Sequence, residues 1–253
     1  MRIRAIFIVI FVVLVVVFVV IGIAHKRHQV CEDVQVELLH SGKDVLLSEQ
    51  DIQSLLKQSH LILEGSLMKE IKKADIEKAL QKNCWFDKIT ELSYQGNVLV
   101  LKISVKHPFL MVFTHNGASY YIDDNGNFLP YSDKVTEEML VLNGNIKTTY
   151  SANKTIKNIP EKSIKEAFEM AKIIQKDNFF RSNISQILIN QENELELYGR
   201  FGQQVILVGH VEKAAEKLEN LKLVYQEAMV YLNPNTYKQI DLRYTNRIVA
   251  TRR

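Results

Sequence analysis

The sequence has little of the residue types that mark disordered, fibrous or disulfide-framed chains. Its 253 residues include four prolines, ten glycines and two cysteines. That Pro and Gly content excludes a collagen-like or low-complexity chain, and two cysteines are too few for the disulfide framework of a small secreted domain. Charge of one sign is also lacking, since 32 Lys and Arg face 29 Asp and Glu. We therefore expect ordinary globular domains and no nucleic-acid partner.

Catalytic and metal-binding motifs are also missing. The sequence contains no G-x-S-x-G, H-E-x-x-H, phosphate-loop or C-x-x-C pattern, and its seven histidines are scattered. Residues 123–126 (Asp-Asp-Asn-Gly) suggest a calcium loop, but glycine stands at the fourth position instead of the sixth and Lys134 replaces the final Glu. We predict a plain turn there, no cofactor and no metal.

Three smaller patterns have structural interpretations. The alternating Glu192, Glu194 and Glu196 predict a solvated strand face. The pair Trp85-Phe86 is expected to anchor a core. Cys31 and Cys84 are expected to be free thiols, although a disulfide between them is allowed outside the cytoplasm.

One hydrophobic run dominates the chain. Residues 5–24 carry no charge and no hydrogen-bonding side chain. As a helix the run is about 30 Å long, which matches the hydrocarbon core of a bilayer, so we predict a single transmembrane helix. Gly22-Ile23-Ala24 has the small-x-small form of a signal-peptide cleavage site, and cleavage after Ala24 stays open. The length of the run favours retention.

The flanks of this run give nearly balanced positive charge, with Arg2 and Arg4 before it and Lys26 and Arg27 after it. Because a first apolar segment normally exports the chain on its C-terminal side, we place residues 1–4 in the cytoplasm and the bulk of the chain outside it. Residues 25–31 are then a juxtamembrane linker.

Residues 32–107 predict a small β-α-α-β-β unit. Val34 and Val36 alternate with polar residues as in a strand, and Ser48 followed by Asp51 is a helix start close to a capping box. The rest of the unit is expected as a helix over 73–81 and a hairpin of strands 86–94 and 98–105 joined at 95–97.

Residues 108–253 predict a mostly antiparallel sheet with two helices, which makes the whole chain an α+β protein. Residues 119–129 are predicted to form a hairpin around the turn 123–126. The helices are expected over 160–177 and 211–229. The remaining strands are expected near 109–113, 184–190, 194–199, 203–208, 237–243 and 247–251.

The first of these units resembles a POTRA domain. The resemblance lies in residues 76–86 (Ile-Glu-Lys-Ala-Leu-Gln-Lys-Asn-Cys-Trp-Phe), 96–103 (Gly-Asn-Val-Leu-Val-Leu-Lys-Ile) and 106–109 (Lys-His-Pro-Phe). POTRA domains are interaction modules found beside membranes, and their strand edges and helix faces bind other chains, so the resemblance implies binding instead of catalysis.

The second unit resembles the bacterial cell-division family FtsQ, also called DivIB. The signature is residues 237–244 (Tyr-Lys-Gln-Ile-Asp-Leu-Arg-Tyr) followed by 246–249, supported by 121–130 and 202–209. The resemblance implies a single-pass protein of the cell inner membrane, enriched at the division site, that acts as a non-enzymatic scaffold of the divisome during septation. The implied partners are FtsB-like and FtsL-like proteins and other divisome membrane proteins.

The same resemblance implies that partners bind by protein–protein interaction at the C-terminal edge strand. An exposed edge offers unpaired N–H and C=O groups to another chain, and Arg and Tyr are common hot-spot residues. Solvent-facing Arg and Tyr on an ordinary strand are the plainer alternative, and a membrane-anchored envelope enzyme acting on cell-wall material is the alternative function. The expected partner-binding residues are Arg243, Tyr244, Arg247, Ile248, Val249, Ala250 and Thr251.

Overall fold

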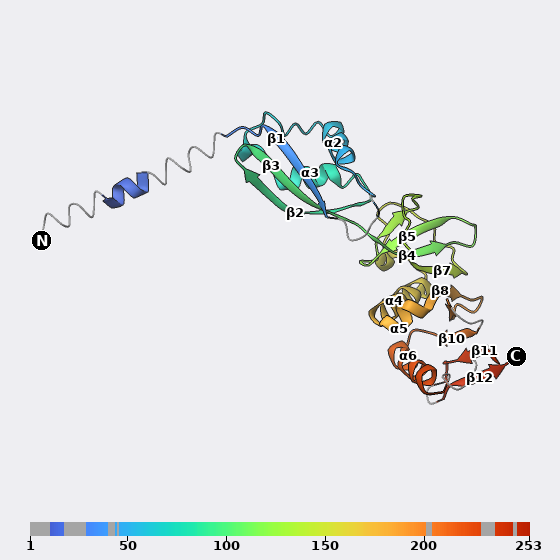
Figure 1. The fold of residues 1–253 in the computed structure, drawn as a ribbon. Helices are drawn as coiled ribbons and strands as arrows, with labels where there is room; N and C mark the ends of the chain where they lie inside the picture. Colours follow the sequence, from blue (N-terminus) through green and yellow to red (C-terminus); the bar gives the residue numbers. More distant parts are fainter. Residues whose placement is uncertain are drawn as a thin grey trace, which may run out of the picture. The chain divides into compact units, whose positions relative to one another are not determined.

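The computed structural model describes residues 11–17, 29–39, 44, 46–200, 204–228, 236–244 and 247–253. It divides into two compact units, Met1–Lys106 and His107–Arg253, which Figure 1 shows in blue to green and in green to red.

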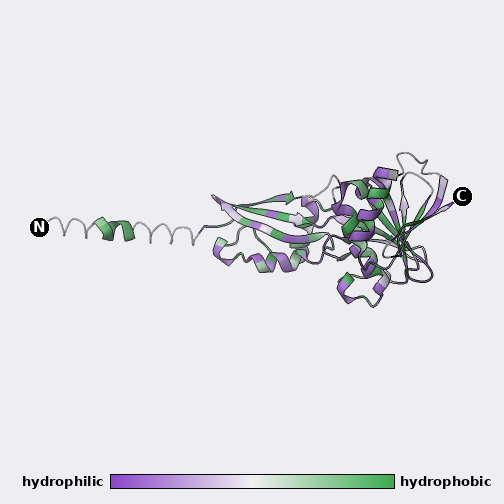
Figure 2. Ribbon diagram, turned by 90° about the horizontal axis from the view of Figure 1, so that it is seen from below, coloured by the Kyte–Doolittle hydropathy of each residue, from purple (hydrophilic) through white to green (hydrophobic). Residues whose placement is uncertain are grey.

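Residues 11–17 are the described part of the predicted membrane span. They form a helix with every side chain exposed, and Figure 2 shows this helix as hydrophobic throughout. The rest of the run 5–24, the cleavage site at Ala24 and residues 25–28 lie outside the described residues. Within the described ranges, no helix has the length and apolar content needed to cross a membrane.

The first unit confirms the predicted order of elements. These are β1 (Asp33–Leu39), α2 (Glu49–Gln58), the 3-10 turn η1 (Met68–Glu70), α3 (Lys73–Leu80), β2 (Phe86–Gln95) and β3 (Val98–Val105). β3 is the central strand, paired in parallel with β1 and antiparallel with β2. Residues 29–31, which precede β1, hydrogen-bond to residues 65–68.

Local chemistry explains why α2 begins where it does. The Ser48 hydroxyl accepts the backbone N–H of Asp51 at 3.2 Å, and the Asp51 carboxylate accepts the backbone N–H of Ser48 at 2.9 Å. This reciprocal capping box satisfies two of the backbone donors that a helix start leaves unpaired. The helix then buries Ile52 and Leu56.

The remaining predictions for this unit concern single side chains. Trp85 and Phe86 are both buried, as predicted. Cys31 and Cys84 are free thiols, so the disulfide that the sequence allowed is not formed.

The second unit is a nine-stranded sheet with helices. Its strands are β4 (Pro108–Phe113), β5 (Ser119–Asp123), β6 (Phe128–Pro130), β7 (Leu140–Gly144), β8 (Ile184–Ile189), β9 (Leu195–Gly199), β10 (Val205–Gly209), β11 (Tyr237–Asp241) and β12 (Val249–Arg252). The spatial order is β12-β11-β10-β9-β8-β7-β4-β5-β6. The pairs β4–β7, β7–β8 and β10–β11 are parallel and the others antiparallel, which confirms the mostly antiparallel prediction.

The prediction of two helices for this unit was wrong. The helix expected over 160–177 is α4 (Lys162–Lys176), and a separate helix α5 (Asn178–Asn183) follows it. Asp177 explains the break, because its carboxylate accepts the backbone N–H groups of Phe179 and Phe180 and so begins a new helix. The third helix, α6 (Ala214–Leu223), starts later than predicted and continues as a π-helical turn, η3 (Val224–Ala228).

The helices and the sheet share one core. The buried residues include Ile164, Phe168 and Ile174 of α4 and Leu218 and Leu221 of α6, and Figure 1 shows α4, α5 and α6 on the same side of the strands.

The predicted hairpin turn between β5 and β6 is confirmed. The buried Asp123 carboxylate accepts the backbone N–H groups of Asn125 and Asn127. Gly126 has a φ of +85°, a conformation that glycine adopts without strain. Asp123 therefore holds the turn through bonds within its own loop.

Gly144, at the end of β7, lies where this strand packs closely against the backbone of β8, so a substitution there can test this contact. Its φ is +105°, and a Cβ there would overlap the carbonyl oxygen of Ile189 on β8. We expect Gly144→Ala to lower the free energy of unfolding by at least about 3 kcal/mol, because backbone strain and a clash with fixed backbone add together.

Gly117→Ala is the matched control, since Gly117 also has a positive φ of +85° but no atom lies within 4 Å of the added Cβ. It should cost about 1 kcal/mol of strain alone. Chemical denaturation of the two variants measures the difference, and equal losses would contradict the close β7–β8 contact.

Candidate functional site

The two edges of the large sheet differ. At one edge, residues 154–156 pair with residues 126–128 and so cover the start of β6: Phe128 donates its backbone N–H to Lys154 O at 3.0 Å, and Ile156 donates to Gly126 O at 2.8 Å. At the other edge is β12, whose four residues are all exposed. In the described part of the chain, β12 pairs with β11 on one side and with no strand on the other. Among the described residues, the sheet therefore presents one edge that is covered at its start and one edge that is open.

The predicted site residues lie along and just before this open edge. Val249, Ala250 and Thr251 belong to β12 and pair with Asp241, Ile240 and Gln239 of β11. Tyr244 follows β11 with 46% of its surface exposed. The guanidinium carbon of Arg247 lies 4.8 Å from the centre of the Tyr244 ring, a cation–π contact. Ile248 instead packs against the core.

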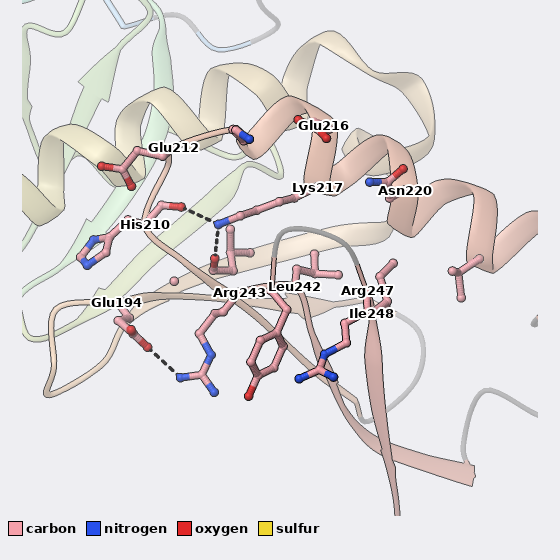
Figure 3. Close-up of a pocket in the computed structure, with 15 residues that line it drawn as sticks. Glu194, His210, Glu212, Glu216, Lys217, Asn220, Leu242, Arg243, Arg247 and Ile248 are labelled. Atoms are coloured by element: carbon pink, nitrogen blue, oxygen red, sulfur yellow. Dashed lines mark hydrogen bonds and ion pairs between the residues drawn. The ribbon is translucent and has the colours of Figure 1, made fainter.

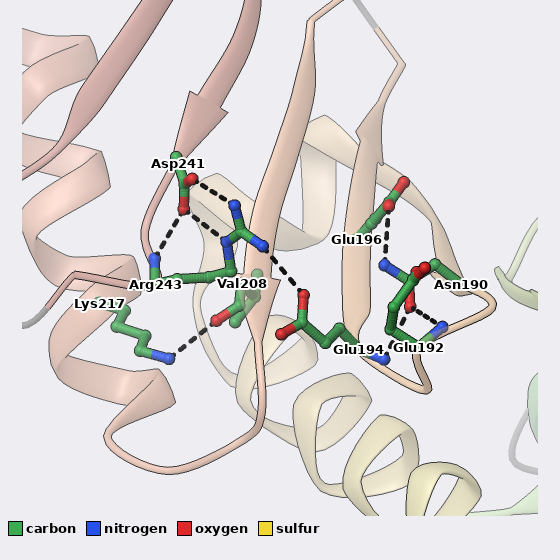
Figure 4. Close-up of polar contacts among 8 residues, drawn as sticks. All are labelled: Asn190, Glu192, Glu194, Glu196, Val208, Lys217, Asp241 and Arg243. Carbon is green, nitrogen blue, oxygen red and sulfur yellow. Dashed lines mark hydrogen bonds and ion pairs between the residues drawn. The ribbon is translucent and has the colours of Figure 1, made fainter.

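Arg243 is held by two carboxylates from different elements (Figure 4). Asp241, the last residue of β11, accepts the Nε–H of Arg243 at 3.0 Å and an Nη2–H at 2.7 Å, and it also accepts the backbone N–H of Arg243 at 3.0 Å. Glu194, just before β9, accepts an Nη1–H at 3.1 Å. The backbone N–H of Arg243 thus bonds to the Asp241 side chain and not to a neighbouring strand. The strand β11 therefore ends at Asp241, before the predicted end at Arg243.

The charges of this cluster shift one another's pKa values. Hydrogen bonding to Arg243 lowers the pKa of the Asp241 carboxyl despite the opposing effect of its burial, and the same pair raises the pKa of Arg243. Burial lowers the pKa of the nearby Lys217 ammonium. That ammonium donates to the backbone carbonyls of Val208 at 2.8 Å and His210 at 3.2 Å.

Arg243, Glu194 and Lys217 line a cleft of about 1010 Å³, drawn in Figure 3. It lies where β10 and β11 end and β12 begins, beside α6. Gly209 at the end of β10 makes room for Arg243, since a Cβ there would lie 3.0 Å from Arg243 Cγ. The cleft is lined by Glu194, Val208, Gly209, His210, Glu212, Lys213, Glu216, Lys217, Asn220, Val224, Leu242, Arg243, Tyr244, Arg247 and Ile248.

Sequence reasoning missed three members of the cluster, Asp241, Glu194 and Lys217. The Asp241-x-Arg243 spacing was a usable signal, because residues two apart on an extended chain share a face. The three alternating glutamates do lie on the solvent side of the strand, with Glu192 exposed and Glu194 and Glu196 partly exposed, but the prediction of a solvated face gave no sign of the partners that two of them have. Glu194 pairs with Arg243, and Glu196 accepts hydrogen bonds from Asn190 and Tyr198. In the described residues, no cluster of His, Cys, Asp and Glu is suited to a metal ion.

Comparison with known families identifies both units. The family described as FtsQ/DivIB, C-terminal related, matches residues 107–251, and the POTRA-like domain matches residues 29–106. The chain belongs to the FtsQ/DivIB family, which confirms the resemblance drawn from the sequence and associates the chain with bacterial cell division. No curated protein matches the chain.

Loss of the Arg243 side chain should reduce stability in a pH-dependent way. In Arg243→Ala the buried carboxylate of Asp241 keeps a backbone donor but loses its cation, so we expect the free energy of unfolding at pH 7 to fall by about 2 kcal/mol. The folded-state pKa of Asp241 is depressed, so its contribution is present above the unfolded pKa of about 3.9 and is lost as the pH falls through the folded value.

Denaturant unfolding at pH 7 and at about pH 3 measures this effect, and the loss should shrink at the lower pH. Tyr244→Ala is the control. Its exposed side chain should change stability by less than about 0.5 kcal/mol at either pH. An Arg243→Ala loss that is the same at both pH values would show that the Asp241 carboxylate is not the cause.

Proposed function

We propose that the protein is a membrane-anchored, non-enzymatic scaffold of the bacterial division machinery that binds partner division proteins along the open edge of β12. The observation that carries this proposal is the contrast between the two sheet edges: residues 154–156 cover the start of β6, and β12 is unpaired on its outer side in the described residues. Membership of the FtsQ/DivIB family supports the division role.

The geometry of β12 suits strand addition. Arg253, the residue after β12, donates its backbone N–H inward to Thr236 O at 3.0 Å. Successive N–H groups of a strand point to opposite sides, so those of Ala250 and Arg252 point outward. A partner strand paired there would gain backbone hydrogen bonds, and the exposed Tyr244 and Arg247 beside it would supply side-chain contacts. FtsB-like and FtsL-like proteins are the proposed partners.

The hydrophobic run at 5–24 supports anchoring in the cytoplasmic membrane as a single-pass protein. In the proposed topology, residues 1–4 are cytoplasmic and the two units, proposed as a POTRA domain over 32–107 and a β domain over 108–253, lie outside. Partners anchored in the same membrane would meet β12 at a raised effective concentration, so a modest edge contact would suffice. The POTRA domain is proposed as a second interaction surface for other divisome membrane proteins.

Ala250→Pro tests the edge directly. Proline removes the outward N–H of Ala250 but not an N–H that faces β11. We expect at least a tenfold weaker affinity of the full chain for an FtsB-like partner, measured by titration in detergent micelles, and loss of midcell localisation of the partner in dividing cells.

Ala250→Val is the control, because valine keeps the N–H and favours strands. Its affinity should match that of the unchanged chain. Normal partner binding by Ala250→Pro would overturn the edge proposal, and hydrolysis of peptidoglycan by the purified full chain would overturn the non-enzymatic role.

A further inference from the structure

We propose that Glu194 is an internal substitute for an acidic side chain of the partner, and that Asp241 is the positioning residue that holds Arg243 ready for it. In the unbound chain, the Glu194 carboxylate is paired with the guanidinium of Arg243. In the complex, an Asp or Glu carboxylate of the bound segment displaces Glu194 from Arg243. This inference rests on the proposed function, because it requires a partner at the β12 edge.

The two carboxylates on Arg243 differ in how firmly they are bound. Asp241 is 5% exposed and accepts three hydrogen bonds from Arg243, one of them from the backbone. Displacing it would leave a buried charge without its cation, which is costly. Asp241 therefore stays bound to Arg243 and fixes the position of the guanidinium.

Glu194 is held much more weakly. It makes a single bond to Arg243, at 3.1 Å, and its side chain is 28% exposed. Its backbone is anchored separately, since the Glu194 N–H donates to Asn190 Oδ1 at 2.9 Å and the Glu194 carbonyl accepts the Asn190 N–H at 3.0 Å. The side chain can leave Arg243 without any movement of this turn, and a partly exposed ion pair is worth little.

The geometry of the guanidinium makes the two acids competitors. Asp241 takes the edge formed by Nε and Nη2, as a side-on pair. The remaining fork, between Nη1 and Nη2, is the one that suits a second bidentate carboxylate. Glu194 already occupies Nη1. A partner carboxylate that binds this fork must therefore compete with Glu194.

Lys217 makes the release of Glu194 inexpensive. Its ammonium lies in the same cleft and interacts electrostatically with Glu194. It donates to two backbone carbonyls, which leaves one of its three N–H groups available. A displaced Glu194 carboxylate thus remains near a positive charge.

The test compares three acidic residues of the full chain in detergent micelles, with a purified FtsB-like division protein of the same cell as the probe. Glu194→Gln should bind the probe about 2- to 5-fold more tightly, since a competing ion pair of this kind is worth a few tenths to one kcal/mol. Glu194→Ala should give the same gain. This second variant is needed because the amide oxygen introduced by Glu194→Gln could still accept the hydrogen bond from Arg243. Asp241→Asn should bind about tenfold more weakly.

Glu192→Gln is the matched control, because it removes one negative charge from the same turn without a side-chain contact to Arg243. Its affinity should not change. An equal gain in Glu192→Gln would mean that general charge, and not competition, is responsible, and the inference would be overturned.

The Arg243→Ala background separates positioning from folding. There, Glu194→Gln should give no gain and Asp241→Asn no further loss, because both act through Arg243. An undiminished Asp241→Asn loss would assign Asp241 a purely structural role. Changing each Asp and Glu of the probe to its amide should identify one position at which the Glu194→Gln gain disappears; if none does, no partner carboxylate uses this fork.

The result also distinguishes this inference from the proposed function. If the unchanged chain binds the probe, Ala250→Pro abolishes binding and Glu194→Gln has no effect, the edge proposal stands and the displacement fails. If the unchanged chain does not bind the probe at all, the proposed function itself fails.

Discussion

An open β-sheet has two edges, and the backbone groups along each must find partners or face solvent. In this protein the two edges meet that constraint differently. The chain folds residues 154–156 back against the start of β6, where Thr155 forms a bridge with Asn127, the residue before the strand. By contrast, β12 carries four exposed residues at the opposite end of the order. The position of β12 depends on β11, and β11 in turn reaches β10 by a parallel crossover through α6. The proposed binding edge therefore depends on the connection from β10 to β11, which is the longest one among strands β8 to β12.

Much of the fold is determined by local sequence. The capping box at Ser48 and Asp51, the Gly96 turn and the Asp123 turn are set by residues within a few positions of one another, so their elements were predicted closely. β7 was missed because Leu140–Gly144 is short and its parallel neighbours β4 and β8 are distant in sequence. α5 was missed because the helical pattern of 160–177 gave no sign that the Asp177 side chain would cap a new helix.

The residues of the candidate site that are close together in the sequence could be predicted, but the contacts between distant parts of the sheet could not. Arg243 and Tyr244 are marked by a family signature, and their exposure was expected. The contact between Arg243 and Glu194 joins residues 49 positions apart in different parts of the sheet. Charge alternation alone cannot identify such a pair, because the same glutamates would look solvated in an isolated hairpin. Asp241 was within reach of sequence reasoning, since a carboxylate two residues before an arginine shares its face.

The geometry of the cleft is sensitive to substitution at Gly209, a residue that a bound partner would not need to contact. It sits at the end of β10 with a φ of +74°, and the aliphatic stem of Arg243 lies over the space where a side chain would be. A larger residue would be strained by its own backbone and would push Arg243 away from Asp241. In a genetic screen for recruitment defects, a single added methyl group at the floor of the cleft would therefore imitate the loss of Arg243, although every residue on the surface keeps its identity.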